Sequence, residues 1–261
     1  MQTGRVYGDL ERPPLRAAPL RRALAAEGWR VEVVQSAGST NALVAERARA
    51  GEPPGLVVVA EQQTAGRGRL DRSWVSPPRA GLTFSVLVAP ELRPAGWSWL
   101  PLLTGLAVAQ ALRARAELDA VLKWPNDVLV DGRKVCGVLA EVPAAGSAVL
   151  GVGLNVTTRQ DELPHSAATS LRLAGAVTTD RDTVLRSVLR SLRRVLDDPV
   201  ASRADYLALC DTLGRQVRLD LPDGRGVQGR ADRVDEDGRL VVEGTPYGAG
   251  DVVHLRPVSG P

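Results

Sequence analysis

The sequence predicts an α+β domain followed by a small β domain, with a boundary near residue 212. Up to that point, helix-forming stretches alternate with short apolar runs that are typical of buried strands. From Gly214 onward, short strand-like runs follow one another and are separated by turns at 222–224 and 235–238, each containing Asp-Gly. Short strands at this spacing are typical of a small β barrel or sandwich.

Length and charge limit the function. A chain of 261 residues can bury a sizeable core, and one large domain plus a small one is the natural expectation. The net charge of +3, from 33 basic and 30 acidic residues, is too balanced to indicate DNA or a membrane surface as the main partner. Two distant cysteines, Cys136 and Cys210, suggest a reduced, cytoplasmic protein. The polar segment 1–14 resembles no signal peptide, and no apolar run reaches the roughly 20 residues that span a bilayer.

The elements of the large domain follow from local signals. Residues 1–14 are expected to form a flexible leader. A helix is expected over Pro19–Glu27, with Gly28 as its stop, and a strand over Trp29–Val34. Residues 39–41, Ser-Thr-Asn, are expected to cap a helix over 42–50 that Gly51 ends. The other expected strands cover 56–60, 82–88, 120–123, 128–130, 135–142 and 148–156, and the other expected helices cover 97–115, 180–196 and 201–213. The small domain is expected to contain strands at 217–221, 227–234, 240–243 and 252–255.

Residues 61–74 form the connection around which the function is organised. Two glycines, Gly66 and Gly68, alternate with Arg67 and Arg69. Glycine allows close approach of the backbone to a ligand, and arginine offers forked donors for carboxylates and phosphates. Similar stretches occur in disordered RNA-binding tails, but this one lies between two predicted strands. We therefore expect a loop that closes over an anionic ligand.

Lysine is almost absent from the chain. Only Lys123 and Lys134, eleven residues apart, are lysines among the 33 basic residues. A compact ammonium group is not interchangeable with a guanidinium where a point charge must approach a reacting centre. This clustering of the two lysines indicates a functional neighbourhood.

Six stretches, in order, resemble the biotin protein ligases. They are Ser-Thr-Asn at 39–41, Gln-Thr-Ala-Gly-Arg-Gly-Arg-x-x-Arg-x-Trp at 63–74, Lys-Trp-Pro-Asn-Asp at 123–127, Lys-Val-Cys-Gly-Val-Leu-Ala-Glu at 134–141, Gly-x-Gly-x-Asn-Val at 151–156 and Ala-Thr-Ser-Leu at 168–171. The resemblance covers roughly residues 30–257. It implies a mixed β-sheet with helices packed on it, as in class II synthetases, over 15–212, and an SH3-like β barrel over 213–261.

The resemblance also implies a reaction in two steps. Biotin's carboxylate attacks the α-phosphate of ATP, brought with Mg²⁺, to give biotinyl-5′-AMP. A lysine of a biotin carboxyl carrier protein domain, part of an acyl-CoA carboxylase, then attacks this mixed anhydride. The residues fit such chemistry, because an ionised carboxylate needs alignment and positive charge rather than a protein base. Neither histidine lies in a motif, and there is no Walker loop.

Residue roles carry over from the resemblance by position. Lys123 and Arg67 are the expected catalytic residues. The expected biotin site consists of Ser39, Thr40, Asn41, Gln63, Gly66, Arg67, Gly68, Arg69, Lys123 and Gly137. The expected ATP site consists of Arg69, Arg72, Trp74, Lys123, Asn126 and Asn155. Metal ligands are not assigned. Two alternatives stay open: residues 39–41 could serve only as a helix cap, and Asn126 only as a turn former, while Trp124 is expected to be structural.

The sequence departs from the family pattern in two places, and two other functions compete with biotin ligation. Asp71 stands where the family often has glycine, and is expected to point at Arg69, at Arg72 or outward. Only about 30 residues precede the ligase region, too few for the DNA-binding domain of some members, which implies a monofunctional form without DNA as a partner. A lipoate–protein ligase shares the fold, but the loop at 66–69 and Lys-Trp-Pro-Asn-Asp favour biotin. A non-enzymatic nucleotide or nucleic-acid binder is disfavoured by the balanced charge and the 3% aromatic content.

Overall fold

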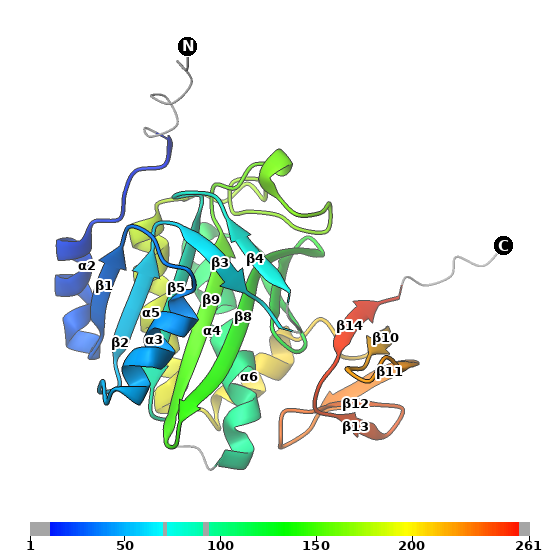
Figure 1. Ribbon diagram of the computed structural model, residues 1–261. Helices are drawn as coiled ribbons and strands as arrows, with labels where there is room; N and C mark the ends of the chain where they lie inside the picture. The colour runs from blue at the N-terminus through cyan, green and yellow to red at the C-terminus, as the bar shows by residue number, and fades with distance from the viewer. Residues whose placement is uncertain (1–10, 70–71, 91–93, 256–261) are drawn as a thin grey trace.

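A mixed seven-stranded sheet forms the centre of the large domain (Figure 1). The computed structural model describes residues 11–69, 72–90 and 94–255. The strands are β1 (Arg30–Val34), β2 (Leu56–Ala60), β5 (Gly81–Val88), β6 (Val121–Lys123), β7 (Asp127–Val130), β8 (Arg133–Ala144) and β9 (Ser147–Asn155), in the order β1-β2-β5-β9-β8-β7-β6. Strands β1 and β2 are parallel, and the other neighbours are antiparallel. The predicted mixed sheet is thus confirmed.

Helices cover both faces of this sheet. They are α2 (Ala17–Leu24), α3 (Thr40–Arg49), α4 (Trp99–Ala116), α5 (Arg181–Asp197) and α6 (Ser202–Leu209), with short 3₁₀ turns at Ala25–Glu27, Pro94–Ser98 and Gln160–Glu162. Helix α3 lies in front of the sheet in Figure 1, and α4 and α5 lie behind it. The continuous apolar run of β2 follows from this arrangement: Val58 packs with Val44 of α3, while Val57 and Val59 belong to the larger core cluster. None of the described helices is long and apolar enough to cross a membrane.

Local signals place most element ends correctly. The Ser39 hydroxyl accepts a hydrogen bond from the Ala42 amide, as a helix N-cap does. Gly28 has φ +76°, and the turn residues Asp131 and Gly132 have φ of +50° and +71°. Helix α6 ends four residues before the predicted 213, because Cys210 is extended and the following amide, that of Asp211, donates to the Leu122 carbonyl of β6.

The segment before α2 is tied down rather than flexible. Arg12 is buried, and its guanidinium binds the Glu162 carboxylate and the Thr157 carbonyl. The Leu15 amide donates to Glu61, whose other oxygen lies 2.7 Å from the Arg181 guanidinium in a buried ion pair. The predicted leader is therefore wrong for residues 11–14, because buried polar groups hold them. Residues 1–10 lie outside the described ranges.

The small domain is a five-stranded antiparallel sheet, shown in orange and red in Figure 1. Its strands are β10 (Gln216–Asp220), β11 (Gly226–Val234), β12 (Leu240–Val242), β13 (Thr245–Tyr247) and β14 (Asp251–His254), in the order β13-β12-β11-β10-β14. Strand β13 was not predicted. The apolar side chains of Val217, Leu219 and Leu240 in the small domain are fully buried. This sheet confirms the small β domain, while the SH3-like description stays a prediction.

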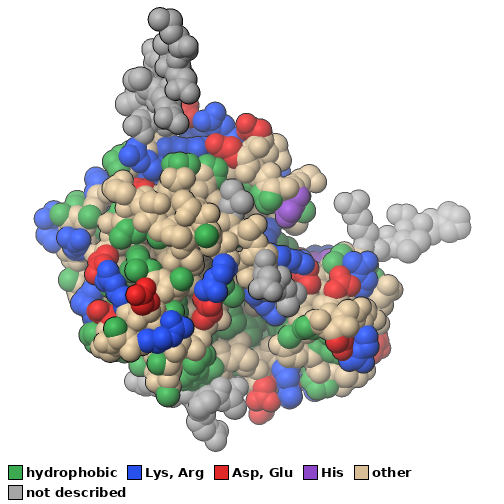
Figure 2. Space-filling model, in the orientation of Figure 1, with side chains coloured by type: hydrophobic (Ala, Val, Ile, Leu, Met, Phe, Trp, Pro, Cys, Tyr) green, Lys and Arg blue, Asp and Glu red, His purple; other side chains and the backbone are tan. Residues whose placement is uncertain are grey.

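Two indoles of the large domain hold the small one. The Trp99 Nε1 donates to the Glu236 carbonyl at 2.8 Å, and the Trp124 Nε1 donates to the Gly238 carbonyl at 3.0 Å. Trp124 is 1% exposed, which agrees with its predicted structural role. On the face shown in Figure 2, basic and acidic side chains are interspersed over both domains, as the balanced composition suggests.

Candidate active site

A cavity of about 450 Å³ opens over the face of the sheet that carries α3. A short two-stranded ribbon, β3 (Gln63–Arg67) and β4 (Ser73–Ser76), forms one of its walls. The stretch predicted as an open loop is therefore largely paired, with Gly66 opposite Trp74 and Arg67 opposite Ser73. Residues 70 and 71 lie outside the described ranges, so the expectation for Asp71 stays a prediction.

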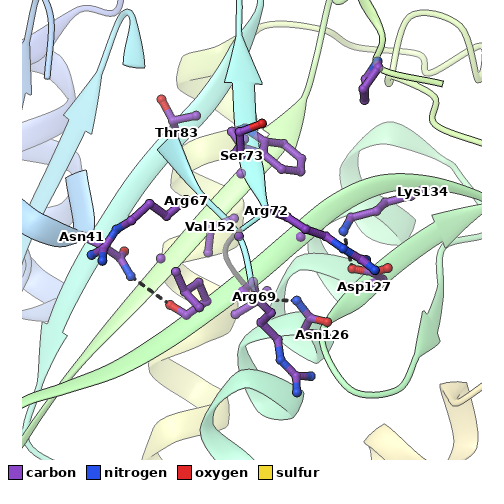
Figure 3. Close-up of a pocket in the computed structure, with 18 of the residues that line it drawn as sticks. Asn41, Arg67, Arg69, Arg72, Ser73, Thr83, Asn126, Asp127, Lys134 and Val152 are labelled. Atoms are coloured by element: carbon purple, nitrogen blue, oxygen red, sulfur yellow. Dashed lines mark hydrogen bonds and ion pairs between the residues drawn. The ribbon is translucent and has the colours of Figure 1, made fainter. Parts of the chain in front are cut away.

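Most predicted site residues meet in this cavity, although the sequence spreads them over more than a hundred positions (Figure 3). The predicted residues that line it are Ser39, Thr40, Asn41, Gln63, Arg67, Gly68, Arg69, Arg72, Trp74, Asn126, Gly137 and Asn155. Lining residues that had not been assigned a role are Ser73, Thr83, Asp127, Lys134, Val138, Leu139, Gly151, Val152, Gly153, Pro164, His165, Ala168, Gly250 and Asp251.

Lys123 is not among the lining residues, so its predicted contact with the substrates stays a prediction. It ends the edge strand β6, and its charge acts on a histidine of the small domain. Burial, with the nearby charge of Lys123, lowers the pKa of the His254 imidazole of β14 to about 4. Gly66 also lies outside the lining. A Cβ there would come within 2.4 Å of the Trp74 carbonyl, so glycine serves the close pairing of the ribbon.

Lys134, the other lysine of the chain, lines the cavity. Its ammonium lies 2.6 Å from the Asp127 carboxylate and 5.8 Å from the centre of the Trp74 ring (Figure 3). Asp127 and Lys134 come from the β7–β8 hairpin, which the Asp131-Gly132 turn closes. The signal that could have found Lys134 was present in the sequence, because it is the other of the two lysines and begins the motif at 134–141.

Glycines make room for the cavity floor. A Cβ on Gly153 would lie 2.4 Å from the Trp74 ring, and one on Gly151 would lie 2.0 Å from the Asn41 Oδ1 atom. Both distances are too short for any other residue without movement. The glycine pair of β9 thus permits Trp74 and Asn41 to pack flat against the sheet.

Three arginines supply positive charge to the cavity, each close to a carboxylate. Burial lowers the pKa of the Arg69 guanidinium, while the charges of Asp127 and Asp251 raise it. The Arg72 guanidinium lies 2.6 Å from the carboxylate of Asp251, and this hydrogen bond raises the pKa of Arg72. Arg67 pairs with Glu141 at 3.0 Å. The guanidinium groups of these arginines offer several N–H donors to an anionic ligand.

No group of three or more His, Cys, Asp or Glu side chains suited to a metal ion occurs within residues 11–69, 72–90 and 94–255. Asp127 and Asp251 line the cavity, but each pairs with a cationic side chain.

Comparisons with known proteins place the chain. Residues 33–156 match the model of the biotin/lipoate A/B protein ligase family. The chain is 43% identical to the biotin–[acetyl-CoA-carboxylase] ligase of Mycobacterium tuberculosis, over 95% of this chain and 98% of that protein. It is 32% identical to the bifunctional ligase/repressor BirA of Escherichia coli, over 83% of this chain and 70% of that protein.

Solved structures agree with the sequence relatives. The biotin protein ligase from Aquifex aeolicus, in complex with biotin and ATP, matches with a TM-score of 0.70 and 29% identity, over 87% of this chain and 99% of that chain. The fold and the cavity thus define a member of the biotin/lipoate ligase class. Within that class, the chain belongs to the biotin protein ligases.

Proposed function

We propose that this protein is an ATP-dependent ligase that activates biotin as biotinyl-5′-AMP and transfers the biotinyl group to a lysine of a biotin carboxyl carrier protein domain. The observation that carries the proposal is that Lys134 and three arginines line one cavity together with the polar residues of the α3 N-terminus. The Aquifex aeolicus neighbour, in complex with biotin and ATP, supports the two small substrates. The Mycobacterium tuberculosis relative, named for the acetyl-CoA carboxylase, supports the class of carrier.

In the first step, a carboxylate oxygen of biotin attacks the α-phosphorus of ATP, and the bond to the pyrophosphate oxygen breaks. No protein base is required, since the carboxylate is ionised at neutral pH. The protein must bring two anions together and stabilise the charge on the phosphate. Lys134 and Arg67 are proposed to hold the carboxylate and the α-phosphate, and Arg69 and Arg72 the other phosphates. Mg²⁺ arrives with ATP and neutralises phosphate charge.

In the second step, a carrier lysine attacks the carbonyl of the mixed anhydride, and AMP leaves. The attacking amine must lose a proton. Asp127 is proposed to accept it, because its carboxylate lies in the cavity beside Lys134.

The polar cluster at the start of α3 is proposed to bind the ring system of biotin. Thr40 and Gln63 are joined by a hydrogen bond of 2.9 Å from the Thr40 amide, and Asn41 lies beside them. Trp74, Asn126 and Asn155 are proposed to flank adenine and ribose. A cytoplasmic location is proposed from the buried free cysteines, which are typical of a reducing compartment.

Pyrophosphate release from Mg-ATP tests the proposal, with biotin and with lipoate in parallel. Release with biotin alone is the expected result, and it should be followed by biotin incorporation into a carrier domain. Release with lipoate alone would keep the mechanism and change the substrate. Release with neither would overturn the enzymatic function and favour a binding protein.

A further inference from the structure

We propose that Glu141 is a positioning residue that holds the Arg67 guanidinium over the cavity and couples it to the Asn41 side chain. The proposal rests on the proposed function, in which Arg67 meets the carboxylate of biotin. Glu141 belongs to β8 and is not among the residues that line the cavity. It therefore acts through its neighbours and not by contact with substrate.

The Glu141 carboxylate bridges two cavity residues. Its Oε1 accepts a hydrogen bond of 3.0 Å from the Arg67 Nη2 atom, and its Oε2 accepts one of 2.7 Å from the Asn41 Nδ2 atom. Arg67 comes from the ribbon strand β3, and Asn41 comes from the first turn of α3. Figure 3 shows the two side chains next to each other at one end of the cavity. One carboxylate thus joins two separate elements of the wall.

Arg67 needs such a partner because little else restrains it. Its side chain is 53% exposed, and glycines precede and follow it in the chain. A long side chain in that setting loses much rotamer freedom when it binds a ligand. The Glu141 contact uses only Nη2, so Nε and Nη1 are not engaged by it and can meet an incoming carboxylate. The contact with Glu141 thus restricts the Arg67 side chain before biotin binds, so less rotamer entropy is lost on binding.

Asn41 is fixed on its other side by a network that reaches the ring-binding cluster. Its Oδ1 accepts a hydrogen bond of 2.6 Å from the Ser85 hydroxyl, and its Nδ2 also donates to the Leu139 carbonyl at 3.2 Å. These contacts define the orientation of the amide. Ser85 also lies 2.8 Å from the Thr40 hydroxyl. The Glu141 carboxylate therefore links Arg67 to a continuous chain of polar contacts that runs through Asn41 and Ser85 to Thr40.

Replacement by glutamine separates the two contacts of Glu141. In Glu141→Gln, the amide oxygen can still accept from Asn41, but the charge that attracts Arg67 is lost. In Glu141→Ala, both contacts are lost. Biotin methyl ester is the matching ligand, because it keeps the ring system and lacks the carboxylate that Arg67 would bind.

Calorimetric binding of biotin and of biotin methyl ester tests the proposal. We expect Glu141→Gln to weaken biotin about five- to tenfold, the scale of ordering one long side chain, and to leave the methyl ester unchanged. Glu141→Ala should weaken both ligands. Equal weakening of both ligands by Glu141→Gln, or no weakening of biotin, would overturn the positioning role.

Two further variants make the result specific. In an Arg67→Ala background, Glu141→Gln should have no further effect on biotin, because residues that act through one another are not additive. Glu32→Gln is the control: it breaks a 2.8 Å ion pair with Arg47 that also anchors α3, and it should change neither affinity. If the unaltered protein bound no biotin at all, the proposed function would fail and this proposal with it. Normal biotin binding that Glu141→Gln does not alter would defeat this proposal alone.

Discussion

The ammonium of Lys134 lies 2.6 Å from the carboxylate of Asp127, and both side chains line the cavity. The pair sits on a short hairpin, in which Asp127 is opposite Gly137. A glycine there leaves space, because a Cβ would come within 3.1 Å of the Lys134 ammonium. The sheet therefore fixes a cation and an adjacent carboxylate at one place, which suits a reaction that needs a charge for the first step and a proton acceptor for the second.

Lys134→Ala should lower the rate of biotin-dependent pyrophosphate release by about 10² or more, the scale of removing one donor to a transition state. Lys123→Ala is the matched control, since it removes the other lysine, which does not line the cavity. It should keep most of the activity. Single-turnover measurements separate this chemical step from product release. A larger loss of activity in Lys123→Ala than in Lys134→Ala would instead support the prediction from the motif that Lys123 is the catalytic lysine.

The choice between these lysines shows what the sequence alone could not decide. Both lie at strand ends, and the face to which each points depends on strand register. In the structure the pairing of β7 with β8 is irregular between Val128 and Leu129. A shift of that kind leaves no local signal. The motifs contain both lysines, and of the two only Lys134 lines the cavity.

Other elements also differ in whether the local sequence or distant contacts determine them. The turn at Asp131-Gly132 and the stop at Gly28 were predictable, because local backbone conformation demands those residues. Strand β13 was not, because Thr245–Tyr247 contains a proline and pairs only through its contact with β12. Glu141 is the last residue of the motif at 134–141, and its role could not be predicted because its two partners lie 74 and 100 residues away.

Gly151→Ala should impair the biotin site. The new methyl group would lie 2.0 Å from the Asn41 Oδ1 atom, so the Asn41 amide must move and lose its contact with Ser85. We expect kcat/KM for biotin to fall by about 10², as misplacement by an ångström can cause. Gly105→Ala, within α4, is the control, because its methyl group would make an ordinary 3.5 Å contact with Leu122 of β6. Unchanged steady-state kinetics in Gly151→Ala would contradict the packing described.

Arg181→Ala should destabilise the fold strongly. The Arg181 and Glu61 side chains are 5% and 3% exposed, so loss of the guanidinium leaves a buried carboxylate without its counter-charge. Breaking a buried pair in this way costs about 3–5 kcal/mol in the free energy of unfolding. Urea unfolding followed by circular dichroism measures it. Arg225→Ala, which breaks an exposed pair with Asp223, should leave the unfolding midpoint unchanged. Equal midpoints for both variants would refute the role of the buried pair.

His254 should make the protein less stable as the pH falls from about 6.5 to about 4. Burial, Lys123 and Arg215 lower the pKa of His254 from 6.5 to about 4, against the opposing charge of Asp211. Between these values the imidazole stays neutral in the folded protein and takes up a proton in the unfolded chain. The unfolded state then binds more protons, so the free energy of unfolding decreases with decreasing pH. His254→Gln can still bond the Thr212 hydroxyl, which lies 3.0 Å from the imidazole, but cannot titrate. Thermal unfolding at pH 7 and pH 5 should therefore show a smaller loss of Tm in His254→Gln than in the unaltered protein, and equal losses would show that His254 does not carry this pH dependence.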